Sequence, residues 1–533
     1  MTLTECRRAG VLLHPSSLPG GAYCGSIGAD ARRFVDLLCA AGLQIWQVLP
    51  LGPTYSDGCP YQSVSVHAGN PDLIDLDWLV DSGLLSQSHA HTGESSPEAK
   101  RQALDEGGRA FFTRIAGESS PALAKRYQWF LQQSAHWLED YVRFQAFREH
   151  LGSLPWTEWP QGLRRREPVA CNELAEQLSE RLAALRFRQF VFHIQWDDLR
   201  CYANERGVLL FGDMPIYVHL ESADVWAHQA LFKLDAHGHP VTVTGVPPDY
   251  FSADGQLWGN PLYDWAAHES DKYAWWIRRL KYNWAVMEET GFHWWLQRFE
   301  TAARQFDITR IDHFRALDAY WEIPAGATSA REGAWVAAPG RALLTAVREE
   351  FPGLCLVAEN LGIISDEVEA LRKDFGLPGM LILQFAFDGN PENPYLLHRH
   401  AAGDVVYTGT HDNNTTLGWF ESLDAEVQSR VYEYFNNPQE RMPWMLIRQA
   451  MSSTSCTAIV PWQDFLGLNG DHRMNTPGTR EGNWRWRFTW EQVPRELAEC
   501  IHGMLQTTDR LPVQDASASV ATASRCDSDP APG

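Results

Sequence analysis

The chain has 533 residues and a formal net charge of −22, because 67 acidic side chains outnumber 45 lysines and arginines. Nucleic acid and anionic membrane surfaces are therefore unsuitable partners, since phosphate contacts need clustered basic residues. Hydrophobic residues make up 44% of the chain and charged residues 21%, as is typical of a globular protein. Ten scattered cysteines without a Cys-x-x-Cys pair, and no apolar stretch near ~18 residues, predict a cytoplasmic protein with reduced thiols.

Short apolar runs recur along the chain, and helical patterns separate them. The runs occupy residues 10–14, 43–51, 208–218, 308–314, 354–359, 380–385, 405–412 and 458–465. Apolar strands separated by helices are typical of a parallel sheet that is buried on both faces. Any one run could instead be a segment of a buried helix, but the number of runs favours an α/β fold of the (β/α)8 barrel type.

The unequal spacing of the runs predicts one barrel domain, residues 1–506, with two large insertions. A mainly helical insertion is expected at about 53–205. A second insertion of loops and helices is expected at about 219–306, with a Gly/Pro/Asp-rich loop at 244–264. Insertions after barrel strands lie at the C-terminal face, where such folds place their functional groups. Residues 507–533 are rich in Ser, Ala, Asp and Pro and are predicted to be a disordered tail.

Four of the predicted strands end in an acidic residue, namely Asp213, Asp312, Glu359 and Asp412. The C-terminal ends of barrel strands meet at one mouth, so these side chains are expected to converge. Glycoside chemistry with retention uses a carboxylate nucleophile and a protonated acid about 5–5.5 Å apart. Any single acid at a strand end could instead be a helix N-cap or an ion-pair partner. The convergence of four favours a catalytic site for sugar chemistry.

Basic side chains accompany these acids. Arg310 and Asp312 are two residues apart on a predicted strand, so both side chains point to the same face. Arg310 would hold Asp312 ionised, as a nucleophile requires. His411, next to Asp412, offers a second polar group for adjacent sugar hydroxyls. His313 directly follows Asp312.

Longer motifs surround these residues in a characteristic order. They are HPSSLPG (14–20), PYQS (60–63), GDMPIYV (212–218), GVPPDYF (245–251), DGQLWGNP (254–261), RIDHFR (310–315), AENLG (358–362), GTHDNNT (409–415), RMNTPGT (473–479) and NWRWR (483–487). With these motifs the chain resembles the 4-α-glucanotransferase family (amylomaltase, or disproportionating enzyme), which is related to the α-amylases. The resemblance extends over roughly residues 10–488.

The resemblance implies a role for each carboxylate. Asp312 matches the nucleophile that forms a covalent glucosyl-enzyme, Glu359 the general acid/base, and Asp412 the carboxylate that stabilises the transition state. It also implies substrate-binding residues, which are Tyr61, Asp213, Asp249, Trp258, Asn260, Arg310, His313 and His411. The segment 249–261 matches a mobile loop that closes over the donor and acceptor sites.

The activity that the resemblance implies is transfer of an α-1,4-glucan segment to the 4-hydroxyl of another glucan or of glucose. The expected substrates are maltooligosaccharides and α-1,4-glucans derived from starch or glycogen. The residues alone leave an α-glucan hydrolase and a non-catalytic glucan-binding protein open as alternatives. Transfer requires a bound acceptor to outcompete water, which needs acceptor subsites and a lid.

No metal or cofactor is expected. The His-x-His pairs at 89–91 and 237–239 lack a third ligand at a useful spacing, and no nucleotide-binding motif follows a predicted strand. The sequence departs from the family pattern at Ala316, where Gly is usual, and at Asn360 and Asn414, where Asp is common. None of these positions removes a catalytic carboxylate, and their effects are expected on specificity and rate.

The chain has 23 tryptophans. Sugar rings present apolar faces that stack on aromatic rings, and Trp258 is assigned to substrate on that ground. The tryptophans of the amphipathic stretch 272–306 recur at roughly helical spacing, and they are interpreted as packing of the insertion on the barrel.

Overall fold

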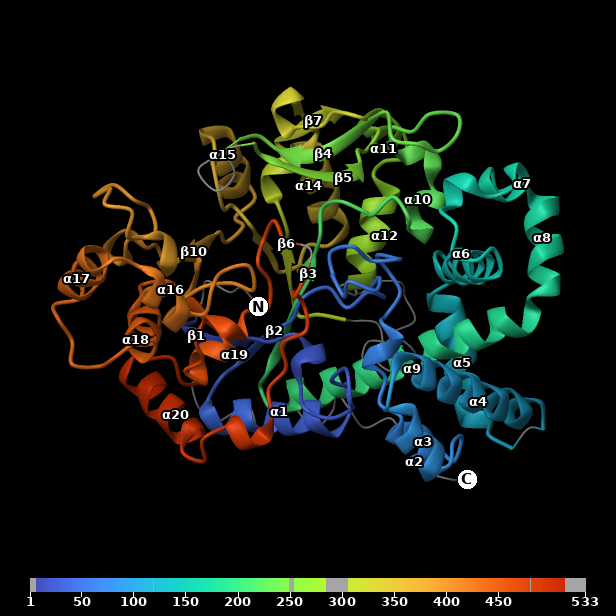
Figure 1. Ribbon diagram of the computed structural model, residues 1–533, viewed down its shortest axis with the longest axis horizontal. Coiled ribbons are helices and arrows are strands. Elements are labelled where there is room, and N and C mark those ends of the chain that lie inside the picture. The colour runs from blue at the N-terminus through green and yellow to red at the C-terminus, as the bar shows by residue number, and fades with distance from the viewer. Residues whose placement is uncertain (1–5, 118, 249–253, 284–304, 480, 513–533) are drawn as a thin grey trace.

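A computed structural model describes residues 6–117, 119–248, 254–283, 305–479 and 481–512. An 8-stranded parallel sheet forms the centre, in the order β10-β11-β12-β1-β2-β3-β6-β9 (Figure 1). Its strands are β1 (Arg8–Leu12), β2 (Ile45–Gln47), β3 (Leu209–Met214), β6 (Ile308–Ile311), β9 (Leu356–Ala358), β10 (Met380–Ile382), β11 (Val405–Tyr407) and β12 (Thr457–Pro461). Each predicted apolar run overlaps one of these strands, so the α/β barrel is confirmed.

The sheet curls round until β9 and β10 are neighbours. The Ala358 N–H donates to the Pro378 carbonyl at 2.8 Å, just before β10 begins. The Met380 N–H donates to the side-chain oxygen of Asn360 at 2.8 Å. The closure is thus partly made by a side chain, and Asn360, one of the departures from the family pattern, has a structural role there.

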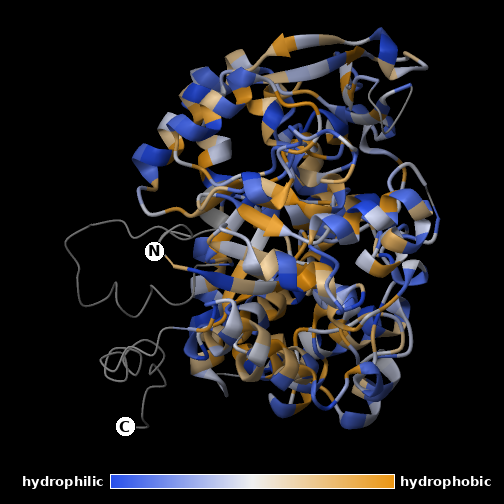
Figure 2. Ribbon diagram, turned by 90° about the vertical axis from the view of Figure 1, so that its left-hand side faces the viewer, coloured by the Kyte–Doolittle hydropathy of each residue, from blue (hydrophilic) through white to orange (hydrophobic). Residues whose placement is uncertain are grey.

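Helices surround the sheet, and hydrophobic residues concentrate on the central strands (Figure 2). Those nearest the barrel include α1 (Ala29–Ala41), α14 (Gly340–Glu350), α15 (Asp366–Asp374), α16 (Thr416–Ser422), α17 (Ala425–Tyr434), α18 (Trp444–Ser452), α19 (Trp462–Phe465) and α20 (Leu497–Thr507). In α1 the side chains of Phe34, Val35 and Leu38 are fully buried. This helix ends at Gly42, whose φ of 77° is the left-handed conformation that favours glycine. No helix among the described residues is long and apolar enough to cross a membrane.

The first insertion is a layer of helices between β2 and β3, on the right of Figure 1. It contains α2 (Asp77–Asp81), α3 (Gln87–Gly93), α4 (Pro97–Ala116), α5 (Pro121–Gln133), α6 (Leu138–His150), α7 (Gln161–Arg164), α8 (Pro168–Gln177) and α9 (Ser179–Glu205). The start of α4 is typical: the Ser96 hydroxyl accepts from the Ala99 N–H at 3.1 Å, and Pro97 occupies the first turn.

The second insertion differs from its prediction. Part of the segment 244–264, predicted as a loop, forms the strands β4 (Thr242–Val246) and β5 (Gln256–Pro261). They join β7 (Ala319–Pro324) and β8 (Ala334–Ala337), which follow β6, in a 4-stranded antiparallel sheet of order β5-β4-β7-β8. Glycine and proline concealed the strand pattern, and two of the pairing partners come from a distant part of the chain.

Short helices complete the second insertion. These are α10 (Ala223–Ala227), α11 (Trp265–Ser270) and α12 (Ala274–Asn283). Trp275 and Trp276 are each 1% exposed, in keeping with the interpretation of these tryptophans as packing residues. The other tryptophans of that stretch fall at 284–304, outside the described residues.

The C-terminal boundary also needs correction. Residues 508–512, assigned to the disordered tail, continue from α20, and Arg510 is fully buried. Its guanidinium donates to the carbonyls of Arg8, Met451, Ser453, Ser455 and Cys456. A single charged side chain thus fixes a segment whose composition alone suggested disorder. Residues 513–533 lie outside the described residues.

Candidate active site

Three of the four predicted acids lie at the C-terminal ends of the adjacent strands β3, β6 and β9. Asp213 is in β3, Asp312 directly follows β6, and Glu359 directly follows β9. Because β3 pairs with β6 with Asp213 opposite Arg310, these two side chains lie at the same level. Asp412 lies farther from its strand than predicted, because β11 ends at Tyr407 and a loop carries the rest of the run.

Arg310 links two of the carboxylates. One guanidinium nitrogen donates to Asp213 Oδ2 at 2.7 Å, and the other donates to Asp312 Oδ1 at 2.7 Å. Burial lowers the pKa of Arg310, but the charges of Asp213 and Asp312 outweigh it and leave the pKa well above its ordinary value. Arg310 is therefore a fixed positive charge that holds Asp312 in place through a charge-assisted hydrogen bond.

Glu359 lies in a different environment. Its Oε2 accepts from the His313 N–H at 2.7 Å and its Oε1 accepts from the Leu361 N–H at 2.8 Å. Burial raises the pKa of Glu359 to about 7, while Arg310 lowers it and the negative charge of Asp312 raises it. Near neutral pH this carboxyl can therefore both give and take a proton.

His313 connects the acids to the antiparallel sheet. Its φ of 52° is left-handed, which is uncommon for a residue other than glycine, and its N–H points to Glu359. Its ring centroid is 4.9 Å from that of Trp258 at 82°. Burial lowers the pKa of His313 to about 4, so the ring is neutral at pH 7. Thus β5 delivers Trp258 to the site. Asn260 lies two residues further on, and Asp249 lies outside the described residues.

A group of three aromatic rings, those of Tyr61, His411 and Trp484, lies beside Asp213. Tyr61, in the loop after β2, donates its hydroxyl to Asp213 Oδ2 at 2.6 Å. Its ring stacks on His411 with centroids 5.3 Å apart and an angle of 13°. The ring of Trp484 is 5.9 Å from each of them. Trp484 belongs to the NWRWR motif, for which sequence reasoning predicted no role.

The carboxylate of Asp412 is held by a segment that follows β12. Asn475 donates its side-chain amide to Asp412 Oδ1 at 2.6 Å, and Arg473 donates to the Asp412 carbonyl at 2.9 Å. His411 Nε2 lies 3.5 Å from the same Oδ1. The Asp412 side chain is 48% exposed, so it is open to a sugar. Sequence reasoning recorded the RMNTPGT motif but missed these two contacts.

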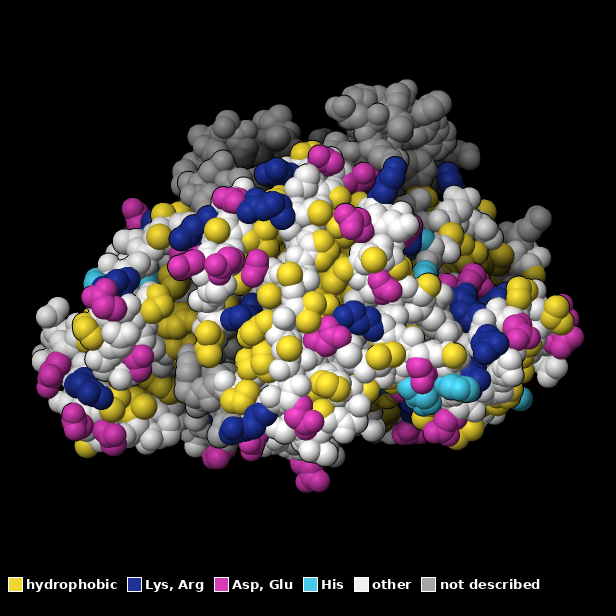
Figure 3. Space-filling view, turned by 90° about the horizontal axis from the view of Figure 1, so that it is seen from above, with side chains coloured by type: hydrophobic (Ala, Val, Ile, Leu, Met, Phe, Trp, Pro, Cys, Tyr) yellow, Lys and Arg dark blue, Asp and Glu magenta, His cyan; other side chains and the backbone are white. Residues whose placement is uncertain are grey.

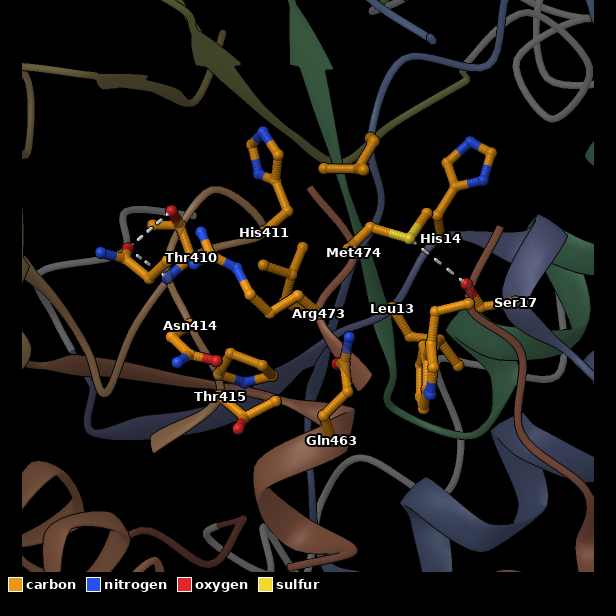
Figure 4. Close-up of a pocket in the computed structure, with 15 residues that line it drawn as sticks. Leu13, His14, Ser17, Thr410, His411, Asn414, Thr415, Gln463, Arg473 and Met474 are labelled. Atoms are coloured by element: carbon orange, nitrogen blue, oxygen red, sulfur yellow. Dashed lines mark hydrogen bonds between the residues drawn. The ribbon is translucent and has the colours of Figure 1, made fainter. Parts of the chain in front are cut away.

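A pocket lies beside His411, between the ends of β1, β11 and β12 (Figure 4). Its labelled lining residues are Leu13, His14, Ser17, Thr410, His411, Asn414, Thr415, Gln463, Arg473 and Met474. Most of its polar groups are neutral, which suits hydroxyl-bearing molecules or water. Among the described residues, no group of three or more His, Cys, Asp or Glu could hold a metal ion.

Comparison with known proteins places this geometry in a family. The family model described as 4-alpha-glucanotransferase matches residues 13–283 and 280–492. A 4-alpha-glucanotransferase of Thermus thermophilus is 43% identical over 519 residues, which cover 95% of this chain and 99% of that protein. The chain belongs to the 4-alpha-glucanotransferase family.

Other members agree with this assignment. A 4-alpha-glucanotransferase of Streptococcus pneumoniae is 41% identical over 516 residues, covering 94% of this chain and 96% of that protein. The structure of amylomaltase from Streptococcus agalactiae in complex with acarbose superposes with a TM-score of 0.87 at 34% identity. That superposition covers 95% of this chain and 100% of the other.

Proposed function

We propose that this 4-α-glucanotransferase cleaves an α-1,4 bond of a maltooligosaccharide and passes the freed segment to the 4-hydroxyl of another glucan or of glucose. The observation that supports it best is the contrast between two neighbouring carboxyls. Asp312 is paired with Arg310 at 2.7 Å, whereas burial raises the pKa of Glu359 to about 7. This is the pairing of a nucleophile and an acid that a retaining mechanism uses.

In the first step, the Asp312 carboxylate attacks the anomeric carbon while Glu359 gives its proton to the departing glycosidic oxygen. The products are a glucosyl-Asp312 ester and a shortened glucan. In the second step, ionised Glu359 takes the proton of the acceptor 4-hydroxyl, whose oxygen attacks the anomeric carbon and releases Asp312. Two inversions give net retention of configuration.

The other residues bind and orient the sugar. Asp412, half-exposed and held by Asn475, accepts hydrogen bonds from hydroxyls of the reacting sugar, and His411 lies beside it. Tyr61 offers its ring to the sugar face, and its hydroxyl holds Asp213. Trp258 and Asn260, on β5, contact the substrate from the opposite wall.

The substrates that suit this site are neutral α-1,4-glucans from starch or glycogen, with glucose as the simplest acceptor. No step of the mechanism needs a metal or a cofactor. A cytoplasmic location is supported by the cysteines of the described residues, which form no disulfide. A relative from Solanum tuberosum that is 40% identical is a chloroplastic or amyloplastic 4-alpha-glucanotransferase.

Incubation with pure maltotriose tests the proposal. We expect a ladder of longer glucans together with glucose, because the acceptor outcompetes water. Shorter sugars alone would instead identify a hydrolase, and an unchanged substrate would favour a non-catalytic glucan-binding protein. The Asp312→Asn variant, run in parallel, controls for contaminating activity.

A further inference from the structure

The rim of the site beyond Glu359 exposes large hydrophobic side chains. Trp335 in β8 is 41% exposed, and Ile363, in the loop after β9, is 55% exposed. Trp335 lies directly opposite Trp321 of β7 in the sheet register, with ring centroids 5.1 Å apart at 66°. Seen from above, this end of the molecule shows hydrophobic side chains between charged ones (Figure 3). Exposed apolar groups of this size commonly mark binding surfaces.

The register extends this row across the whole sheet. Gly245 of β4 is opposite both Trp321 of β7 and Leu257 of β5, so the side chains of the row share one face. Leu257 is 47% exposed. Its neighbour Trp258 points to the other face, toward His313. Trp258 of this sheet therefore lies toward the reaction centre, whereas Trp321 and Trp335 lie on the opposite face.

Arg315 ties this face to the catalytic loops. Its guanidinium carbon lies 3.8 Å from the centroid of the Trp335 ring, and it donates a hydrogen bond to the Ile363 carbonyl. Arg315 is in the 3-10 helix η5 (Phe314–Leu317), directly after the segment with Asp312, and Ile363 is in the loop that starts at Glu359. The exposed indole thus packs on Arg315, which joins the two segments that follow Asp312 and Glu359 in the chain.

We propose that Trp335, backed by Arg315, is a glucan-contact surface on the acceptor side of the site, which holds sugar rings beyond the one that reacts. The proposal rests on the proposed function, because Glu359 protonates the leaving chain and deprotonates the incoming one. Both chains therefore pass on the Glu359 side, where the Ile363 loop and Trp335 lie.

The chemistry of the surface fits an α-1,4-glucan. The apolar face of a glucose ring can lie flat on an indole, and the Arg315 contact fixes the indole before the sugar arrives, which lowers the entropic cost of binding. An exposed ion pair in the connections of this sheet, between Arg331 before β8 and Asp254 before β5, has a separation of 3.0 Å and offers partners for sugar hydroxyls. A neutral chain longer than one ring is the occupant that uses all of these groups.

Acceptor length is the variable that tests the proposal. With a fixed donor and labelled acceptors from glucose to maltohexaose, we expect Trp335→Ala to lower the ratio of kcat/KM for maltohexaose to that for glucose by roughly 3- to 10-fold. Trp335→Phe keeps a flat ring and should restore most of the ratio. Leu154→Ala removes another exposed side chain, 44% exposed in the helical insertion, and should leave the ratio unchanged.

An unchanged ratio in Trp335→Ala would overturn the proposal, whether kcat/KM stays at the wild-type value or falls equally for every acceptor length. Circular dichroism checks the fold of each variant. If the alanine variant does not fold, Trp335→Leu, which keeps apolar bulk against Arg315 but no flat ring, has the same expected result. A wild-type protein without transfer would overturn the proposed function as well, whereas an active wild type with an unchanged ratio removes this inference alone.

Discussion

Arg310 sets the charge balance of the site, because one guanidinium holds two carboxylates at 2.7 Å each. This contact fixes the orientation of the Asp312 carboxylate. Asp312→Asn keeps the shape of the side chain but removes the nucleophilic charge. We expect kcat for maltotriose to fall by about 10³-fold or more, with an unchanged thermal midpoint of unfolding. If the variant keeps more than about a tenth of the activity, the assignment of the nucleophile is wrong.

Glu359 gives a pH prediction. Its raised pKa of about 7 means that the carboxyl keeps its proton up to neutral pH and loses it above. Formation of the glucosyl-enzyme needs the protonated form, so kcat/KM for a maltooligosaccharide donor should fall as the pH rises above about 7.

A matched donor isolates this effect. Maltosyl fluoride has a leaving group that needs no proton, so the rate of its first step should stay flat across pH 7. Glu359→Gln should process the fluoride in that step but not the maltooligosaccharide. A maltooligosaccharide profile that is flat from pH 6 to 9 would contradict the role of Glu359 as the acid.

At the scale of elements, loops from distant parts of the chain complete the site. The segment after β12 places Asn475 against Asp412 at 2.6 Å. Asn475→Ala should lower kcat by roughly 10- to 100-fold, because a misplaced binding group loses transition-state contacts. Asn475→Asp should lower kcat further, since it places two carboxylates next to each other. Thr479→Ala, an exposed hydroxyl in the same segment, is the control. Equal kcat values in all three variants would contradict the positioning role.

The difference between local and distant contacts explains how far the sequence could predict these elements. The barrel strands are continuous apolar runs, so they are visible in the sequence one at a time. The strands of the antiparallel sheet are not visible in this way. β4 contains Gly245, and it pairs with β7, which follows the whole second insertion. Likewise, Asp312 and Arg310 lie on one strand and their contact follows from alternation, whereas no local pattern relates Asn475 to Asp412.

At the scale of the whole molecule, the barrel brings residues that are far apart in the chain to one mouth. Hydrogen bonds between β9 and the start of β10 close the barrel. Closure between β9 and β10 uses the Asn360 side chain, which also donates to Glu369 at 2.7 Å. An Asp at this position could accept from the Met380 N–H but could not donate to Glu369 when ionised. Asn360, a departure from the family pattern, thus has an acceptor in Glu369 that suits its amide group.

Arg510 joins the start and the end of the described chain. It is fully buried, and it donates to the carbonyl of Arg8, the first residue of β1. It also donates to the carbonyls of residues 451, 453, 455 and 456, which precede β12. Arg510→Ala leaves these carbonyls without their donor inside the protein. We expect the free energy of unfolding to fall by roughly 3–5 kcal/mol, measured by denaturant titration, because buried unpaired polar groups are costly. Arg495→Ala, an exposed arginine at the approach to α20, should change it by less than about 0.5 kcal/mol. Equal stability of the two variants would mean that the last described residues do not hold the barrel closed.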